Sequence, residues 1–157
     1  MKLQQTEKIL EKLLNALQKH LCDHLDQQSK HMLWELEQLK PASYEKITAS
    51  KCPTCSYLEY ALSTIPKDLA PLDVLAKALA NQVVWHEASR GVPDLFKGGY
   101  AFAEVIGRQG LMQSDSIRLG LFLQKPDINY PLHAHDADEL YLILSGNASW
   151  QIEDLEF

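Results

Sequence analysis

The sequence predicts an α+β protein, with a helical N-terminal region over residues 1–95 and a β region over residues 96–157. Two patterns predict this division. In the first half, apolar residues recur every three or four positions, which is the period of an amphipathic helix. After Pro93, short alternating runs are separated by Gly, Pro, Asn and Asp. Such runs indicate an antiparallel sandwich or barrel.

The helical region is expected to hold two long helices and two later ones. The first two cover residues 9–21 and 32–39, and Pro41 stops the second. A short helix is expected within residues 55–65. The last and clearest helix is expected within residues 66–93, where a Gly and a Pro end it. Its apolar stripe consists of Leu72, Leu75, Leu79 and Val83.

The β region is expected to begin after the turn at Gly98 and Gly99. Strands are predicted first over Tyr100–Ile106 and Ser116–Gln124, where aromatic and β-branched residues alternate with others. Three shorter strands are then expected. They cover residues 130–135, 139–146 and 148–154.

Composition excludes several classes of partner. The chain has 157 residues, 46% of them hydrophobic, and a net charge of −6. This charge argues against nucleic acid, which requires a basic surface. No basic run suggests an anionic membrane, and no apolar stretch approaches the roughly 20 residues of a membrane span. The N-terminus lacks the apolar core of a secretory signal, so a cytoplasmic location is expected.

One stretch, YPLHAHDADELYLILSG at residues 130–146, concentrates titratable side chains. His133 and His135 are two positions apart, so on a strand both imidazoles point to the same side. Glu139 reaches the same point if the chain bends at residues 136–138. Two imidazoles and a carboxylate suit a divalent transition metal, with Zn, Fe, Mn, Co and Ni all candidates. The alternative is a solvated loop beside an acidic turn.

The spacing of this stretch resembles the first motif of the cupin superfamily. The matching residues are His133, His135, Glu139 and Gly146. Asp127 stands where the motif has a leading glycine, which puts the preceding turn in question. The resemblance implies that residues 96–157 form part of a cupin (jelly-roll-like) β-barrel.

Two tyrosines narrow the resemblance. With Tyr130 and Tyr141, the stretch resembles that of cupin-type dimethylsulfoniopropionate (DMSP) lyases, as do the preceding SRGVPDLF, GGYAFAEVIG and IRLGLFLQ. This implies a β-elimination of DMSP to dimethyl sulfide and acrylate. It further implies that Tyr141 is the base and that Tyr130 is the second choice, as base or substrate anchor. Ordinary packing of aromatic residues in a β-barrel is the alternative.

The sulfonium cation of this substrate class is attracted to the faces of aromatic rings. Candidate substrate-binding residues on the expected strands are Tyr100, Phe102, Phe122 and Trp150. Each is equally explained as a core residue.

Other reactive side chains are given less weight. Cys52 and Cys55 form a CxxC, but no strand is expected before it, as a thioredoxin-like motif requires. A structural zinc site needs two more ligands, and nothing fixes the approach of the residues in HLCDH. Both cysteines are therefore interpreted as small, buried or half-buried residues. His86 is expected near a helix end, where packing or capping explains it.

A second cupin motif, with its further metal-binding histidine, is not found, because no histidine follows Gly146. The sequence is therefore interpreted as a truncated form or fragment, with unpaired sheet edges that favour association. A homodimer that completes the barrel is one such association, although nothing in the sequence specifies it. Three hypotheses follow: a metal-dependent lyase by descent, a non-catalytic ligand-binding or sensor module, and an inactive chain.

Overall fold

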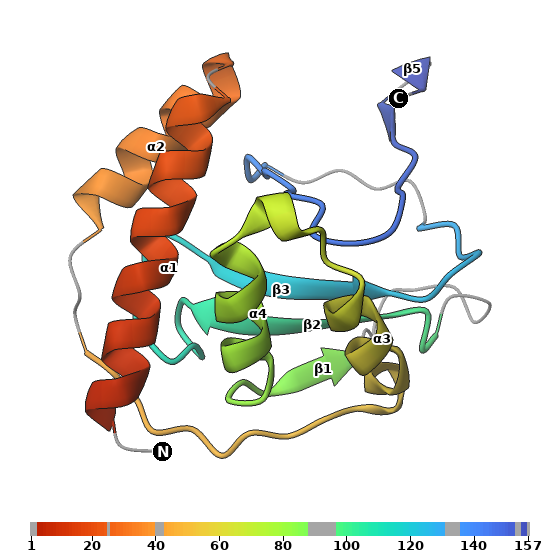
Figure 1. Ribbon diagram of the computed structural model, residues 1–157, viewed down its shortest axis with the longest axis horizontal. Helices are drawn as coiled ribbons and strands as arrows, with labels where there is room; N and C mark the ends of the chain where they lie inside the picture. The colour runs from red at the N-terminus through yellow and green to blue at the C-terminus, as the bar shows by residue number, and fades with distance from the viewer. Residues whose placement is uncertain are drawn as a thin grey trace.

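Helices and an open antiparallel sheet make up the computed structural model of this chain, which supports the α+β class (Figure 1). The helices cover one side of the sheet, and the two ends of the chain lie on opposite sides of the view. Within the described ranges, the strands do not close into a barrel. The structure describes residues 3–24, 26–39, 43–87, 97–130, 136–152 and 155–156.

Two long helices begin the chain, as expected. Helix α1 spans Leu3–Asp23 and α2 spans Gln27–Gln38. Helix α1 buries an apolar stripe that includes Leu10 and Leu13, and it packs against α2 and α4. The Thr6 hydroxyl donates a hydrogen bond of 3.0 Å to Gln82 Oε1, just beyond α4. The helical region is therefore fixed to the rest of the core by both apolar and polar contacts.

Shorter helices follow a long connecting segment. A 3₁₀ helix, η1, covers Pro53–Tyr57 and continues into α3, Leu58–Ser63. A second 3₁₀ turn, η2, covers Lys67–Leu69 and precedes α4, Leu72–Ala80. The short helix expected within residues 55–65 is confirmed.

The long helix expected within residues 66–93 is wrong at its C-terminal end. Helix α4 ends at Ala80, and Trp85–Glu87 forms strand β1. The Trp85 Nε1–H donates 2.9 Å to the Ala80 carbonyl oxygen, which stabilises this change of direction. A valine pair followed by tryptophan favours a strand when a partner strand is available. Here Trp85 pairs with Ala103 of the next strand.

The sheet has the order β1-β2-β3, with both pairings antiparallel. Strand β2 spans Tyr100–Ile106, as expected, and β3 spans Leu119–Gln124, three residues shorter than expected. Two short strands pair with each other near the C-terminus. They are β4, Gln151–Ile152, and β5, Leu155–Glu156.

The strand expected over residues 139–146 is wrong, because this described segment pairs with no strand. Its alternating pattern has a different origin. Leu142 and Leu144 pack against the hydrophobic core, while Glu139 and Tyr141 are exposed. The segment is therefore irregular in structure, and its apolar side covers part of the hydrophobic core.

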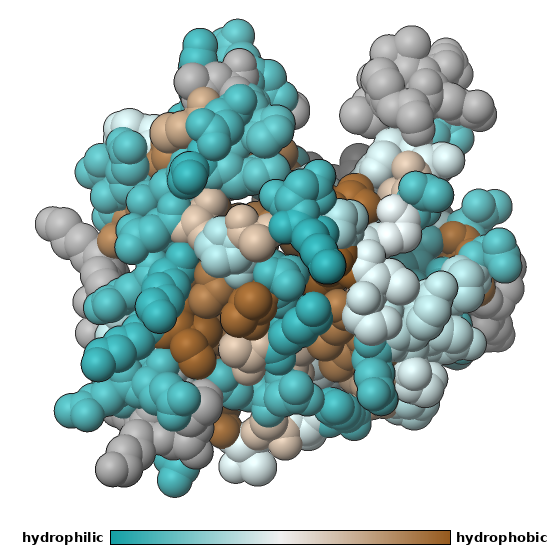
Figure 2. Space-filling model, in the orientation of Figure 1, coloured by the Kyte–Doolittle hydropathy of each residue, from teal (hydrophilic) through white to brown (hydrophobic). Residues whose placement is uncertain are grey.

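The hydrophobic core lies between the helices and one face of the sheet. Alternate residues of β2, namely Ala101, Ala103 and Val105, are at most 1% exposed, as are Leu79 and Val83 on the helical side. Figure 2 shows a mainly hydrophilic surface on this side, with hydrophobic side chains gathered near its centre. Among helices of the described residues, none has the length and apolar character of a membrane span.

Candidate functional site

The other face of the sheet, here called the open face, carries the candidate site. On β2, Tyr100, Phe102 and Glu104 alternate with the buried alanines and valine and are only partly buried. Strand pairing aligns Phe102 with His86 of β1 and with Phe122 of β3. Because side chains alternate across a sheet, these residues share the face that the helices do not cover.

Five rings meet on the open face, and we call them the aromatic cluster. It consists of Tyr100, Phe122, Tyr130, Tyr141 and Trp150. Tyr100 stacks on Phe122 with a centroid distance of 5.1 Å, and Tyr130 meets both edge-on at 5.3 and 5.8 Å. Tyr141 lies 6.2 Å from Phe122 and 4.7 Å from Trp150. The cluster therefore joins two strands to the segment that follows them.

A tight turn after β3 directs the chain back over the open face. Asp127 has φ 57°, a left-handed conformation that favours glycine and that aspartate tolerates better than most residues. The Gln124 side-chain amide donates 2.7 Å to the Ile128 carbonyl oxygen and holds the turn. Asp127, which stands where the resembled motif has a leading glycine, thus adopts a conformation that glycine favours.

Tyr141 and Glu139 form the polar contact of the site. The Tyr141 hydroxyl donates a hydrogen bond of 2.9 Å to Glu139 Oε2. The two side chains lie on the same side, as their two-residue spacing predicts for an extended backbone. Partial burial, then the hydrogen bond to Glu139 and its negative charge, hold the pKa of the Tyr141 phenol well above its ordinary value.

Tyr130 is similarly affected. Burial raises the pKa of Tyr130 to about 12, with further contributions from Tyr100 and Glu139. Both phenols are therefore protonated at neutral pH. In this arrangement they are hydrogen-bond donors, and either one must lose its proton before it can act as a base.

The expected metal ligands lie only partly within the described residues. Glu139 is described, whereas His133 and His135 lie outside the described residues. Within the part of the chain that is described, no group of three or more His, Cys, Asp or Glu side chains could hold a metal ion. The carboxylate of Glu139, at the edge of the aromatic cluster, and two nearby imidazoles in the sequence fit a divalent transition metal by donor chemistry.

Phe102 lies on the open face in a different environment from the aromatic cluster. Its ring is 5.5 Å from that of His86, and the Arg118 guanidinium carbon lies 5.7 Å from its centroid. Glu104 holds this guanidinium, accepting from Arg118 Nε at 2.7 Å and from the Gln109 backbone N–H at 2.6 Å. The expected helix-end position of His86 is wrong, since it lies on β1.

Sequence reasoning missed the ion pair of Glu104 and Arg118. Alternation along Tyr100–Ile106 could have placed Glu104 beside Tyr100 and Phe102, on the same face. The partner could not be found this way. Arg118 precedes β3, and the pairing of β2 with β3 includes a register shift between Glu104 and Ile106.

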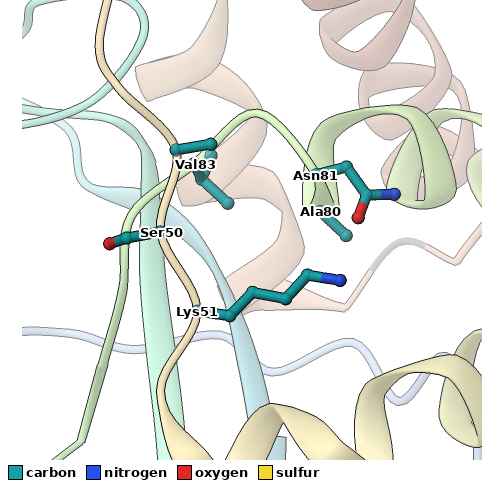
Figure 3. A pocket seen from close by; sticks show the side chains of 6 residues that line it. Ser50, Lys51, Ala80, Asn81 and Val83 are labelled. Atoms are coloured by element: carbon teal, nitrogen blue, oxygen red, sulfur yellow. The ribbon is translucent and has the colours of Figure 1, made fainter.

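A hollow elsewhere offers less chemistry. Its volume is about 210 Å³, and it lies beside the C-terminal end of α4, where Lys51 extends towards Ala80 and Asn81 (Figure 3). Its lining residues are Ala49, Ser50, Lys51, Ala80, Asn81 and Val83. None of these is acidic or aromatic, so the open face is the better candidate for acid–base chemistry.

Comparison with known proteins gives one family. Residues 24–157 match the dimethylsulfoniopropionate lyase family. A protein of Cereibacter sphaeroides, named as the dimethylsulfoniopropionate lyase DddL, is 30% identical over 77 residues, covering 48% of this chain and 32% of that protein. The dimethylsulfoniopropionate lyase DddQ of Ruegeria pomeroyi is 32% identical over 80 residues, covering 51% and 39%.

The matched region covers between 32% and 39% of the length of these relatives. No solved structure matches the chain.

Proposed function

Because the chain belongs to the dimethylsulfoniopropionate lyase family, we propose that its open face binds DMSP and serves a carbon–sulfur lyase that releases dimethyl sulfide and acrylate. The observation that carries this proposal is the contact of Tyr141 with Glu139 beside the aromatic cluster. A phenol, a carboxylate and a wall of rings suit a substrate with an acidic proton and a cationic leaving group.

In the proposed reaction Tyr141 is the base. Its phenolate takes a proton from the carbon next to the substrate carboxylate. The electron pair of that C–H bond forms the carbon–carbon double bond of acrylate. The adjacent C–S bond breaks, and its electron pair leaves with sulfur as dimethyl sulfide. Tyr130, which contacts Tyr100 and Phe122, anchors the substrate or replaces Tyr141 as base.

Glu139, together with His133 and His135, would hold the divalent transition metal. When bound, this ion supplies Lewis acidity towards the substrate carboxylate and a positive charge that favours phenolate. Zn, Fe, Mn, Co and Ni all fit the donor set. In this proposal, Glu139 therefore serves as a ligand and as the present hydrogen-bond acceptor of Tyr141.

The aromatic cluster accounts for binding of the sulfonium group. Tyr100 and Trp150 flank the two tyrosines of the motif, and Phe122 contacts three of the other four rings. A cation over such faces is stabilised by roughly 0.5–2 kcal/mol per ring. Phe102 shares the open face, but the Arg118 guanidinium beside its ring makes it a weaker candidate for binding the sulfonium cation. The proposal includes the family's cupin barrel, of which β2 and β3 would form one wall.

Replacing Tyr141 with Phe tests the proposal, because it removes one hydroxyl and retains the ring. With metal and DMSP supplied, release of dimethyl sulfide into the headspace is expected to fall by about 10²–10⁴-fold, the usual contribution of a general base. Tyr60→Phe is the matched control, since Tyr60 is 74% exposed on α3 and outside the cluster. Equal rates for the two variants would remove Tyr141 from the role of base.

A non-catalytic binding module is the second candidate. The raised pKa values of Tyr130 and Tyr141 favour it, because a protonated phenol donates hydrogen bonds but removes no proton. Calorimetry of the unsubstituted, metal-loaded chain separates the two candidates. Binding of DMSP without release of dimethyl sulfide would favour the binding module, and release would favour the lyase.

A further inference from the structure

Cys52 and Cys55 lie side by side at the start of η1. In the sequence they are distant from the residues of the aromatic cluster. Their sulfur atoms are 3.6 Å apart, and the Cys55 backbone N–H donates 3.0 Å to the Cys52 carbonyl oxygen. Cys55 is buried, whereas Cys52 is only partly buried. The two side chains therefore already converge, and one of them is accessible to solvent.

The turn that carries the cysteines is firmly anchored. Thr54, 1% exposed, donates to Glu87 Oε1 through its backbone N–H at 2.7 Å and its hydroxyl at 2.5 Å. The Gly98 carbonyl oxygen lies 3.0 Å from the same hydroxyl. These contacts tie Thr54, one of the two residues between the cysteines, to β1 and to the turn before β2. The backbone between the sulfurs is thus held in one shape.

The chain before the motif is extended, which the sequence did not predict. Ser50 pairs with Val84 in a parallel bridge, and the Trp85 backbone N–H donates 3.0 Å to the Ser50 carbonyl oxygen. An extended residue followed by CxxC at the beginning of a helical turn shares part of the local arrangement of redox-active pairs, in which the motif follows a strand and begins a helix. The single bridge at Ser50 is not a strand, so the redox inference depends on the convergence of the two sulfur atoms rather than on a thioredoxin-like arrangement.

We infer that Cys52 and Cys55 are a redox modification site, which forms an intramolecular disulfide on reaction with a small-molecule disulfide. The thiol of Cys52 loses its proton, and its sulfur attacks the reagent, releasing one thiol. The sulfur of Cys55 then attacks the Cys52 sulfur of the mixed disulfide and releases the second thiol. The chain loses two electrons and two protons, which convert one reagent disulfide into two thiols.

The environment of the pair indicates modification rather than turnover. Burial, followed by the contact with Cys55, raises the pKa of Cys52 to about 11. A thiol with this pKa is almost entirely protonated at neutral pH, so exchange is slow. Partial exposure makes Cys52 the first sulfur to react, and burial makes Cys55 the resolving one.

Intact-mass measurement with oxidised glutathione tests this inference on a background of Cys22→Ser, which removes the exposed third cysteine. The C22S chain is expected to lose two hydrogens, to resist alkylation and to recover on reduction. Adding Cys55→Ser should leave Cys52 trapped as a glutathione adduct. Adding Cys52→Ser should leave Cys55 largely unmodified, with an adduct yield about tenfold lower.

Two outcomes would overturn the inference. One is a C22S chain that remains fully alkylatable under conditions in which Cys22 of the unsubstituted protein takes up glutathione. The other is equal adduct formation by the two double variants. If a double variant fails to fold, peptide mapping of the oxidised C22S chain decides the matter, because the Cys52–Cys55 cross-link is either present or absent.

Discussion

The two faces of the β1-β2-β3 sheet share their strands but differ in what covers them. The packed face contributes Ala101, Ala103 and Val105 to a core closed by α4, and these residues are at most 1% exposed. The open face carries the rings of Tyr100, Phe102 and Phe122. The first two are partly buried, and Phe122 is 40% exposed. Along β2, small side chains thus lie where the helices approach closely, and large rings lie on the opposite face.

This difference assigns most of the folding stability to the packed face and the candidate chemistry to the open face. Burial of apolar side chains supplies most of the folding free energy, and it occurs on the packed face. The open face retains exposed rings, a carboxylate and phenols with raised pKa values. The packed face therefore supplies more of the stability than the site residues do.

The largest expected effect comes from the packed face. Leu79→Ala removes a side chain that is 1% exposed, and the cavity should lower the free energy of unfolding by about 2–5 kcal/mol. Phe122→Ala on the open face, although it removes more atoms, should cost only about 1–2 kcal/mol because the ring is partly exposed. Chemical denaturation measures both. A larger loss for Phe122→Ala would reverse the assignment of the two faces.

A smaller effect concerns the turn that leads Tyr130 to the open face. Asp127→Val places a β-branched residue at φ 57°, which should lower the free energy of unfolding by about 1–2 kcal/mol. Asp127→Gly is the matched control and should change it by less than about 0.5 kcal/mol, since relief of strain is offset by unfolded-state entropy. Thermal unfolding tests this pair. If valine is tolerated as well as glycine, the turn is not held left-handed.

The smallest expected effect is a pH dependence of the open face. The pKa of Tyr130 is raised to about 12, so its contribution to stability is complete below pH 10 and is lost between pH 10 and 12. The side chain is 36% exposed, and solvent screening reduces the loss to about 1 kcal/mol. Denaturation at several alkaline pH values should show a shallower decline for Tyr130→Phe. An identical decline would mean that Tyr130 titrates normally.

Residue periodicity in the sequence correctly predicted those elements that depend mainly on neighbouring residues. The alternation of Tyr100–Ile106 gave β2 with its observed ends, and the two-residue spacing of Glu139 and Tyr141 gave a shared side. The apolar stripe through Leu79 and Val83 predicted a helix that continued past Ala80, which is wrong. A helical period carries no information about the pairing of Trp85 with Ala103. That pairing depends on a strand nearly twenty residues away in the sequence.

The candidate site was predictable in its residues but not in its arrangement. Tyr100, Phe122, Tyr130, Tyr141 and Trp150 could each be named from the sequence, yet their meeting depends on the β2–β3 register and on the turn at Asp127. Phe102, named together with them, lies instead beside His86 and Arg118. Contacts between distant segments decide this, and no local period encodes them.

The most direct test of the central claim uses the six tyrosines as internal reporters, through the ring signals of ¹³C-labelled tyrosine during titration of the metal-loaded protein with DMSP. Tyr100, Tyr130 and Tyr141 lie in the aromatic cluster, and the other three, Tyr44, Tyr57 and Tyr60, lie outside it. Shifts confined to the first three are the expected result. Shifts confined to the other three, or no shift at saturating DMSP, would contradict the assignment of the open face as the substrate site.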